Sequence, residues 1–200
     1  TVIDDNAFTG CSSLKNIEIP SFVTTISENS FSKCYHLESV KIPSSVISIK
    51  SCAFSECSSL TSIDIPPSVT SIEYKAFYRC SSLSSIKISS SMQSIAEFTF
   101  FGCSSLKEIK IPSSVSAINS NAFSECTSLQ KIEIPSSVKF IGEYAFSECS
   151  SLVNIIIPSS VKSIGDYAFS GCFSLKQIKI PSNINPKTLG IASYVKVKRS

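Results

Sequence analysis

Apolar and polar positions follow one another along this 200-residue chain in a pattern that recurs every 23 residues. One copy reads A-F-x-x-C-x-S-L-x-x-I-x-I-P-x-S-V-x-x-I-x-x-x, and eight of its positions are almost always apolar. The interval is kept without insertion or deletion by eight phenylalanines and eight cysteines: Phe8, Phe31, Phe54, Phe77, Phe100, Phe123, Phe146 and Phe169, with Cys11, Cys34, Cys57, Cys80, Cys103, Cys126, Cys149 and Cys172. An invariant period of this length predicts a solenoid, in which stacked coils share one elongated core.

Within each copy, the hydrophobic pattern predicts a coil made of short extended pieces. The segment x-I-x-I alternates with a period of two, which predicts a short strand with one buried face. Proline follows it in seven of eight copies and should end the strand, because proline has no N–H to donate to a ladder. V-x-x-I predicts a second extended piece, and the polar stretch before Ala-Phe suits a turn leading into one helical turn. Stacked coils would pair their strands in parallel, so we expect an α/β solenoid.

The repeats account for residues 1–184, and the first is truncated because its opening Thr-Val-Ile matches the interior of the next copy. We therefore expect a fragment of a longer protein. The pattern decays after Ile184, where Lys187 stands in the place of a buried isoleucine. New apolar residues in 185–200 favour a cap that closes the last coil and carries a basic tail. A linker towards an anchor is the alternative.

The unit L-x-x-I-x-I-P-x-S-V-x-x-I-x-x-x-A-F-x-x-C resembles the BspA-like (treponemal) class of leucine-rich repeats, over residues 1 to about 184. The resemblance implies a right-handed arc with a parallel β-sheet on its concave side and short extended pieces and single helical turns elsewhere. Members of this class are typically surface proteins of host-associated bacteria and parasitic protists, linked with adhesion to host cells, matrix proteins or other microbes. The Ser-rich, near-identical repeats look more like the protist versions. The family implies no catalytic residue and no particular ligand.

Charge and hydropathy narrow the possible partners. The formal net charge is +3, and much of it lies in the final stretch, at Lys187, Lys196, Lys198 and Arg199. Because the repeats themselves are nearly neutral, we expect no nucleic-acid partner and no general attraction to a membrane surface. No apolar run approaches the roughly 18 residues needed to cross a bilayer, so we expect no direct membrane insertion of this segment.

The nine cysteines do not predict a disulfide framework. Eight of them occupy one inward column, where the Cβ vectors run side by side, so we expect free thiols that fill the core. Cys52 breaks the period and belongs to a column of mixed polarity, so we expect it to be exposed. An exposed thiol could be reactive or pair between chains, although an incidental surface residue is the simpler interpretation.

The sequence offers no catalytic constellation. Its single histidine, His36, occupies a column otherwise filled by serine, and no aspartate lies near it in the same or the next coil. Cys34 belongs to the core column, and no third ligand accompanies this Cys–His pair as a metal site would require. Glycine-rich phosphate loops are absent. We therefore expect no enzyme activity, no cofactor and no metal.

Three sets of exposed positions are candidates for binding a protein. In the strand column that contains Lys87 and Lys110, charges of opposite sign mostly alternate between neighbouring copies. This pattern suits either a self-complementary soluble surface or a protein-binding face that recognises the charge pattern of a partner. Apolar residues replace polar ones in the last repeats, and an aromatic–basic group crowds the fourth and fifth repeats, where local packing of irregular coils is the alternative. The candidate residues are Val153, Ile156, Phe173, Tyr74, Tyr78, Arg79, Lys87 and Lys110.

These features favour a non-enzymatic adhesion or recognition module, at the cell surface or secreted, that binds a host cell-surface or matrix protein. An intracellular protein-interaction scaffold is one alternative, because free core thiols suit either compartment. A structural spacer within a longer surface protein is another. The sequence does not decide the oligomeric state.

Overall fold

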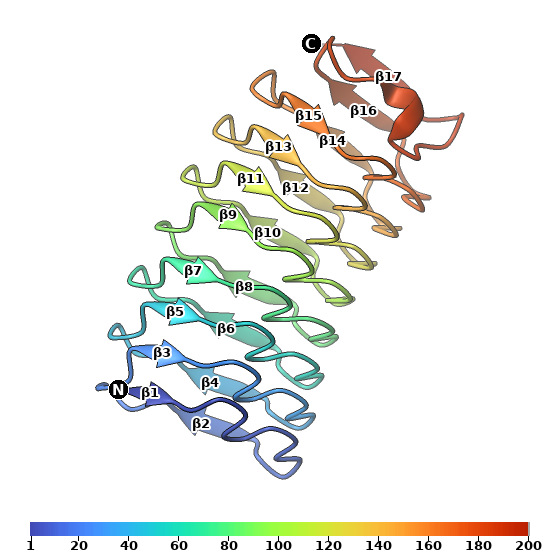
Figure 1. Ribbon diagram of the computed structural model, residues 1–200. Helices are drawn as coiled ribbons and strands as arrows, with labels where there is room; N and C mark the ends of the chain where they lie inside the picture. The colour runs from blue at the N-terminus through green and yellow to red at the C-terminus, as the bar shows by residue number, and fades with distance from the viewer. Residues whose placement is uncertain (200) are drawn as a thin grey trace.

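The structure is a computed structural model that describes residues 1–199, and it forms an elongated stack of coils (Figure 1). The two termini lie at opposite ends of the stack (Figure 1). Each full coil contributes one longer and one two-residue strand, and both rows run along the whole stack. The elongated shape follows from the invariant repeat, because each coil buries its apolar positions against the coils before and after it.

The longer strands form what we call the long-strand face, and the two-residue strands form the short-strand face. The long strands are β2 (Asn16–Glu18), β4 (Ser39–Lys41), β6 (Ser62–Asp64), β8 (Ser85–Lys87), β10 (Glu108–Lys110), β12 (Lys131–Glu133), β14 (Asn154–Ile156) and β16 (Gln177–Ile180). The short strands are β1 (Val2–Ile3), β3 (Thr25–Ile26), β5 (Ser48–Ile49), β7 (Ser71–Ile72), β9 (Ser94–Ile95), β11 (Ala117–Ile118), β13 (Phe140–Ile141) and β15 (Ser163–Ile164). The last strand is β17 (Lys196–Arg199).

All strand pairs are parallel, and within the repeats each residue faces its equivalent one period away, as the pair Ile17 and Val40 does. The short strands form two ladders, β1-β3-β5-β7 and β15-β13-β11-β9. The break between β7 and β9 falls at the coil in which Ser89 replaces proline and Met92 replaces valine. The long strands form smaller groups, β2-β4, β6-β8, β10-β12 and β14-β16-β17.

The helical turns expected around each Ala-Phe are not confirmed. Among residues 1–199, the only helix is the 3-10 helix η1 (Pro186–Thr188), so the fold is a parallel β-solenoid. In the repeats, the residues two before and two after each phenylalanine have left-handed backbone, with φ between +53° and +72°. Phe8 donates its N–H to the Ser30 carbonyl of the next coil at 2.7 Å, and this bond recurs along the stack. We call this third side the turn edge; it is held by bonds between coils rather than by helical bonds within one.

The core is a column of phenylalanine rings flanked by a column of thiols. Neighbouring rings from Phe8 to Phe169 stack with centroids 5.1–5.8 Å apart and planes within 14° of parallel. From Cys34 to Cys172, each ladder thiol donates to the carbonyl of a phenylalanine 26 residues earlier, at 3.0–3.3 Å. Thiols therefore satisfy carbonyl oxygens as well as filling space.

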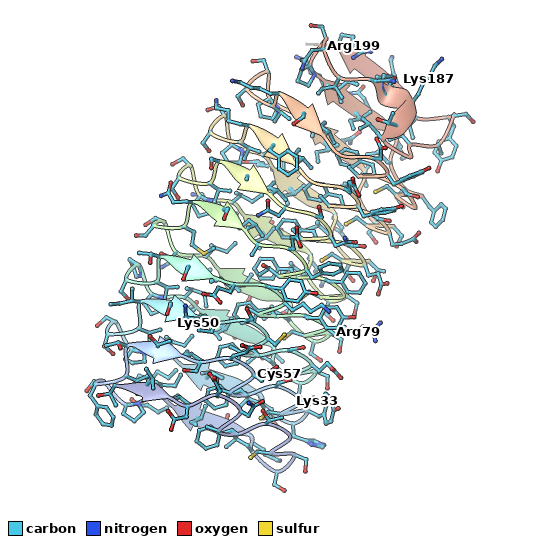
Figure 2. All side chains as sticks on the ribbon, viewed as in Figure 1. Lys33, Lys50, Cys57, Arg79, Lys187 and Arg199 are labelled. Atoms are coloured by element: carbon cyan, nitrogen blue, oxygen red, sulfur yellow. The ribbon has the colours of Figure 1, made fainter. Side chains whose placement is uncertain are left out.

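All nine cysteines are free, as expected for the eight of the ladder, and seven of the ladder positions are buried. Figure 2 shows Cys57 within the stack of coils. Two expectations need correction. Cys11 is exposed although it belongs to the ladder, because it lies in the first coil. Cys52 is only partly exposed, because its side chain lies beside the neighbouring coils of the turn edge.

Residues 185–199 pack against the last coil, and Ser200 lies outside the described residues. Strand β17 extends the long-strand face by pairing with β16, while Leu189 and Val195 are buried. The guanidinium of Arg199 donates to the carbonyls of Pro181 and Ile184, which ties the end of the chain to the last coil.

Candidate interaction surfaces

An apolar groove opens on the long-strand face between β12 and β14. It encloses about 540 Å³, and Val153 and Ile156 both line it. Ile156 is 63% exposed, whereas the equivalent positions of the other coils carry Lys, Glu or Asp. Phe173 is 69% exposed but does not line the groove. The structure therefore brings Val153 and Ile156 together and leaves Phe173 on a separate part of the surface.

Phe173 lies in the column that follows each ladder cysteine, where most coils carry serine. Its carbonyl accepts a hydrogen bond from the Tyr194 hydroxyl at 2.8 Å, so it lies next to the segment that packs on the last coil. Phe173 therefore lies at the C-terminal end of the turn edge and is not part of the groove lining.

The aromatic residues predicted to crowd the fourth and fifth repeats do form one cluster. The rings of Tyr78 and Phe101 stack with centroids 5.1 Å apart. Tyr74 meets Phe98 edge-on at 5.8 Å, and Phe98 lies 5.6 Å from Phe101. Four rings from two neighbouring coils therefore form a continuous aromatic surface on the turn edge.

Lys75 fills the centre of this cluster. The Lys75 ammonium lies 5.0 Å from the ring centroids of Tyr74 and Tyr78 and 5.3 Å from that of Phe98. A hydrogen bond with the Tyr74 side chain raises the pKa of Lys75, which keeps the ammonium charged. Arg79 places its guanidinium carbon 5.4 Å from the Tyr78 centroid and is exposed at the turn edge (Figure 2). We call these residues together the aromatic–basic edge.

The cation–π contacts change how the aromatic–basic edge can act. Contacts of this kind stabilise by about 0.5–1 kcal/mol at exposed sites. The Lys75 ammonium and the surrounding ring faces therefore already interact within the chain and need no binding partner. Tyr74, which is 41% exposed, and Arg79 remain accessible. Lys75 belongs to the group of residues that the sequence predicted to crowd the fourth and fifth repeats, but the pattern did not indicate that its ammonium lies among the rings.

Lys87 and Lys110 are exposed on β8 and β10, as expected. The register places Lys87 beside Asp64 and Lys110 beside Glu133. Glu133, however, forms its ion pair with Lys131 of its own strand, at 2.7 Å. That hydrogen-bonded pair lowers the pKa of Glu133 and raises the pKa of Lys131. The charge column is therefore only partly self-complementary.

Ion pairs across coils occur near the N-terminal end of the long-strand face. Lys41 and Glu18 approach to 2.6 Å, and Lys15 and Glu38 to 4.0 Å. A further pair, Lys50 with Glu73 at 2.7 Å, joins neighbouring coils beside the short strands. In this part of the stack, oppositely charged residues of neighbouring coils therefore form direct ion pairs, and few lysines there lack a carboxylate partner.

A shallow trough of about 640 Å³ runs along the turn edge, and sequence reasoning did not anticipate it. The columns on either side of the ladder cysteines line it: Tyr35, Glu56, Ser58, Arg79, Ser81, Gly102, Ser104, Glu125, Thr127 and Glu148. Its serine and threonine hydroxyls are occupied, since Ser81 donates to the Ser58 carbonyl and the equivalent residues of other coils do the same. The trough therefore presents mainly carboxylates. Aligning the residues immediately before and after each ladder cysteine would have indicated this trough and its carboxylates.

No reactive centre is visible in the described part of the chain. His36 is exposed, and its Nδ1 lies 2.7 Å from the Ser12 carbonyl oxygen. Among residues 1–199, His, Cys, Asp and Glu side chains form no group of three that could hold a metal ion. Over the same residues, no helix has the length and apolar character that crossing a membrane requires.

Comparison with known proteins places these surfaces in context. The model of the BspA type leucine rich repeat region, in six copies, matches residues 1–95 and 70–190. No curated protein sequence matches the chain.

Three solved structures are similar over almost the whole chain. A leucine-rich repeat protein from Bacteroides ovatus is 31% identical with a TM-score of 0.81, over 98% of this chain and 54% of its own. A leucine rich cell surface protein from Faecalibacterium prausnitzii is 30% identical with a TM-score of 0.61, over 97% and 62%. A leucine rich repeat protein of T. pallidum is 28% identical with a TM-score of 0.75, over 92% and 87%. The chain thus spans less than two thirds of the first two relatives.

Proposed function

Because this chain belongs to the BspA-type leucine-rich repeat family, we propose that it is a non-enzymatic recognition module of a cell surface that binds host or matrix proteins. The similar protein from Faecalibacterium prausnitzii is described as a cell surface protein, which supports this location. As a leucine-rich repeat protein with bacterial relatives, the chain is suited to protein interaction through its side-chain columns.

One observation carries the proposal: Val153 and Ile156 line an open groove on a face that is otherwise polar. Leaving an isoleucine mostly exposed forfeits about 1.5–3 kcal/mol of burial, which a partner could recover. Exposed apolar surface rimmed by polar residues typically marks a protein-binding site. The aromatic–basic edge is the second candidate, and its Tyr74 and Arg79 are residue types enriched in binding hot spots.

A structural spacer is the alternative that an observation favours. Lys75 already fills the ring cluster, and ion pairs such as Lys41–Glu18 satisfy part of the long-strand face. A spacer would present surfaces whose charged and aromatic groups are already paired with one another, and it would bind no partner itself.

The test is binding of the purified fragment to host cells and to immobilised matrix proteins, measured by flow cytometry and surface plasmon resonance. The groove variant Val153→Ser/Ile156→Ser should weaken binding by about tenfold or more, because apolar anchors carry most interface energy. The variant Thr61→Ser/Asp64→Ser changes the equivalent positions of another coil and should bind like the wild type. A third variant, Tyr74→Ser/Arg79→Ser, tests the aromatic–basic edge. Absence of binding by the folded wild-type fragment would favour the spacer.

A further inference from the structure

We propose that the apolar groove and the lysines beside it form one site, which takes an acidic segment of a protein partner that carries an apolar anchor residue. This inference rests on the proposed function and specifies the chemistry of the partner. It follows from the register of three strands, from the absence of counter-charges there and from the shape of the groove.

Strand register brings the lysines to the groove. Strands β14, β16 and β17 lie side by side, and their pairing places Ile156, Lys179 and Lys198 in one row. In a parallel sheet, paired residues point to the same face. Ile156 and Lys198 are exposed, and the intervening Lys179 is partly exposed. The row therefore runs from the apolar groove directly into two cations.

Two further lysines border the same surface. Lys196 pairs with Gln177 on the outward face of β17, two residues from Lys198. Lys176 is exposed, and its N–H donates to the Val153 carbonyl at 2.8 Å, so it lies next to the other residue of the groove. We call Lys176, Lys179, Lys196 and Lys198 the lysine border.

The lysine border lacks counter-charges. Among residues 1–199, none of its four ammonium groups takes part in an ion pair; the lysines that do are Lys15, Lys41, Lys50 and Lys131. The strands β14, β16 and β17 contain no acidic residue. On the opposite wall of the groove, Glu133 is already paired with Lys131. The C-terminal end of the long-strand face therefore carries four uncompensated positive charges, in contrast to the paired charges of the first coils.

Charge complementarity and the groove together select the occupant. Uncompensated lysines attract carboxylates and repel basic partners, which orients a ligand and speeds its association. The groove, at about 540 Å³, adds a place for a large apolar side chain. A polysaccharide polyanion would satisfy the lysines but would leave the groove unfilled. An acidic peptide with a leucine or phenylalanine uses both features, so it is the occupant that we propose.

The experiment uses fluorescence anisotropy with a labelled short peptide of Asp and Glu that carries a central Leu-Phe pair. The same peptide with Ser-Ser in the centre, a lysine-rich peptide with Leu-Phe, and heparin as a competitor complete the set. We expect the acidic Leu-Phe peptide to bind the fragment and the lysine-rich peptide not to bind. Replacing Leu-Phe by Ser-Ser should weaken binding about tenfold, and raising the salt concentration should weaken it further.

Variants connect this binding to the site. Both Lys179→Gln/Lys198→Gln and Val153→Ser/Ile156→Ser should weaken binding of the acidic Leu-Phe peptide by about tenfold. The matched control Lys139→Gln/Lys162→Gln removes two exposed lysines from elsewhere on the stack and should leave the affinity within about twofold, because distant exposed charges are screened. Circular dichroism first establishes that each variant is folded.

Three results would overturn the inference: no binding of the acidic Leu-Phe peptide, equal binding of its Ser-Ser form, or equal loss in the lysine control. Strong heparin binding that ignores the groove variant would identify a polyanion site instead and also counts against it. Host-cell binding is measured in parallel on the same samples. A fragment that binds cells but not the acidic peptide refutes this inference and leaves the proposed function intact. Peptide binding without any cell or matrix binding would refute the proposed function.

Discussion

Replacing Phe123 with alanine removes a central ring from a stack of eight. The ring is fully buried, with neighbouring centroids 5.4 Å away at Phe100 and 5.5 Å away at Phe146. Truncating a buried phenylalanine costs about 3–5 kcal/mol, because transfer energy is lost and a cavity remains. The two lost ring contacts account for about 0.5–1.5 kcal/mol each within that sum. Phe8 is partly exposed, and within the described residues it stacks only on Phe31, so Phe8→Ala should cost about half as much, ~1.5–2.5 kcal/mol.

Urea titration followed by circular dichroism measures both effects. Because coils stabilise one another only through neighbours, the central substitution should also uncouple the two halves of the stack. This uncoupling should appear as a lower slope of the unfolding transition, or as two transitions, for Phe123→Ala alone. Lys87→Ala is the surface control and should change the free energy of unfolding by less than about 1 kcal/mol. Equal destabilisation by Phe8→Ala and Phe123→Ala would show that neither ring stacking nor position in the array determines the stability of a coil.

Two further predictions concern the thiols and the turn edge. Thiol labelling of the native fragment should modify Cys11 quickly and Cys52 slowly, and it should reach the buried ladder cysteines only after unfolding. Burial protects these thiols and raises their pKa, to about 12 for Cys80. Rapid labelling of several ladder cysteines, detected by mass spectrometry, would contradict their inward position. Gly171→Ala should lower the free energy of unfolding by about 1 kcal/mol or more, since φ is +72° and a Cβ would meet the Glu148 carboxylate. Adding Glu148→Ala should recover only the steric part, and full recovery in urea titrations would exclude backbone strain.

The repeat pattern alone predicted most of the scaffold. The interval between Phe8 and Phe31 implied the stacked coils, and the alternation around Ile63 implied which strand positions are buried. Buried columns are predictable because each apolar residue must pack against its equivalents in adjacent coils. The proline that follows seven of the eight long strands likewise indicated where those strands end.

The turn edge was not predictable in the same way. Asn6 and Gly10, which tolerate left-handed backbone, mark the two special positions of the first coil, but Tyr144 and Glu148 occupy the same columns later. Such substitutions hid the conformation and suggested a helical turn instead. The bonds to the next coil hold the backbone there whatever the side chain, so tertiary contacts override local preference.

The candidate sites depended on contacts that a single repeat does not reveal. Val153 and Ile156 were singled out because apolar residues replace polar ones at their positions in the repeat, a departure that is visible in the sequence; the structure places both in one groove. The separation of Phe173 from the groove depends on where its coil meets the final segment, near Tyr194. The filling of the ring cluster by Lys75 depends on side-chain rotamers, which the repeat does not specify.

Within the repeats, cross-coil bonds of one kind keep a constant offset in sequence, and this regularity has an evolutionary consequence. Thiol-to-carbonyl bonds span 26 residues, and paired short strands are 23 residues apart, as Val2 and Thr25 are. A duplication or deletion of one complete repeat would reconnect equivalent atoms and keep every face in phase. Any other length change would rotate all later coils relative to earlier ones. Unequal recombination can therefore change the length of the solenoid in steps of about 4.8 Å, one strand spacing per repeat, while its surface columns stay aligned.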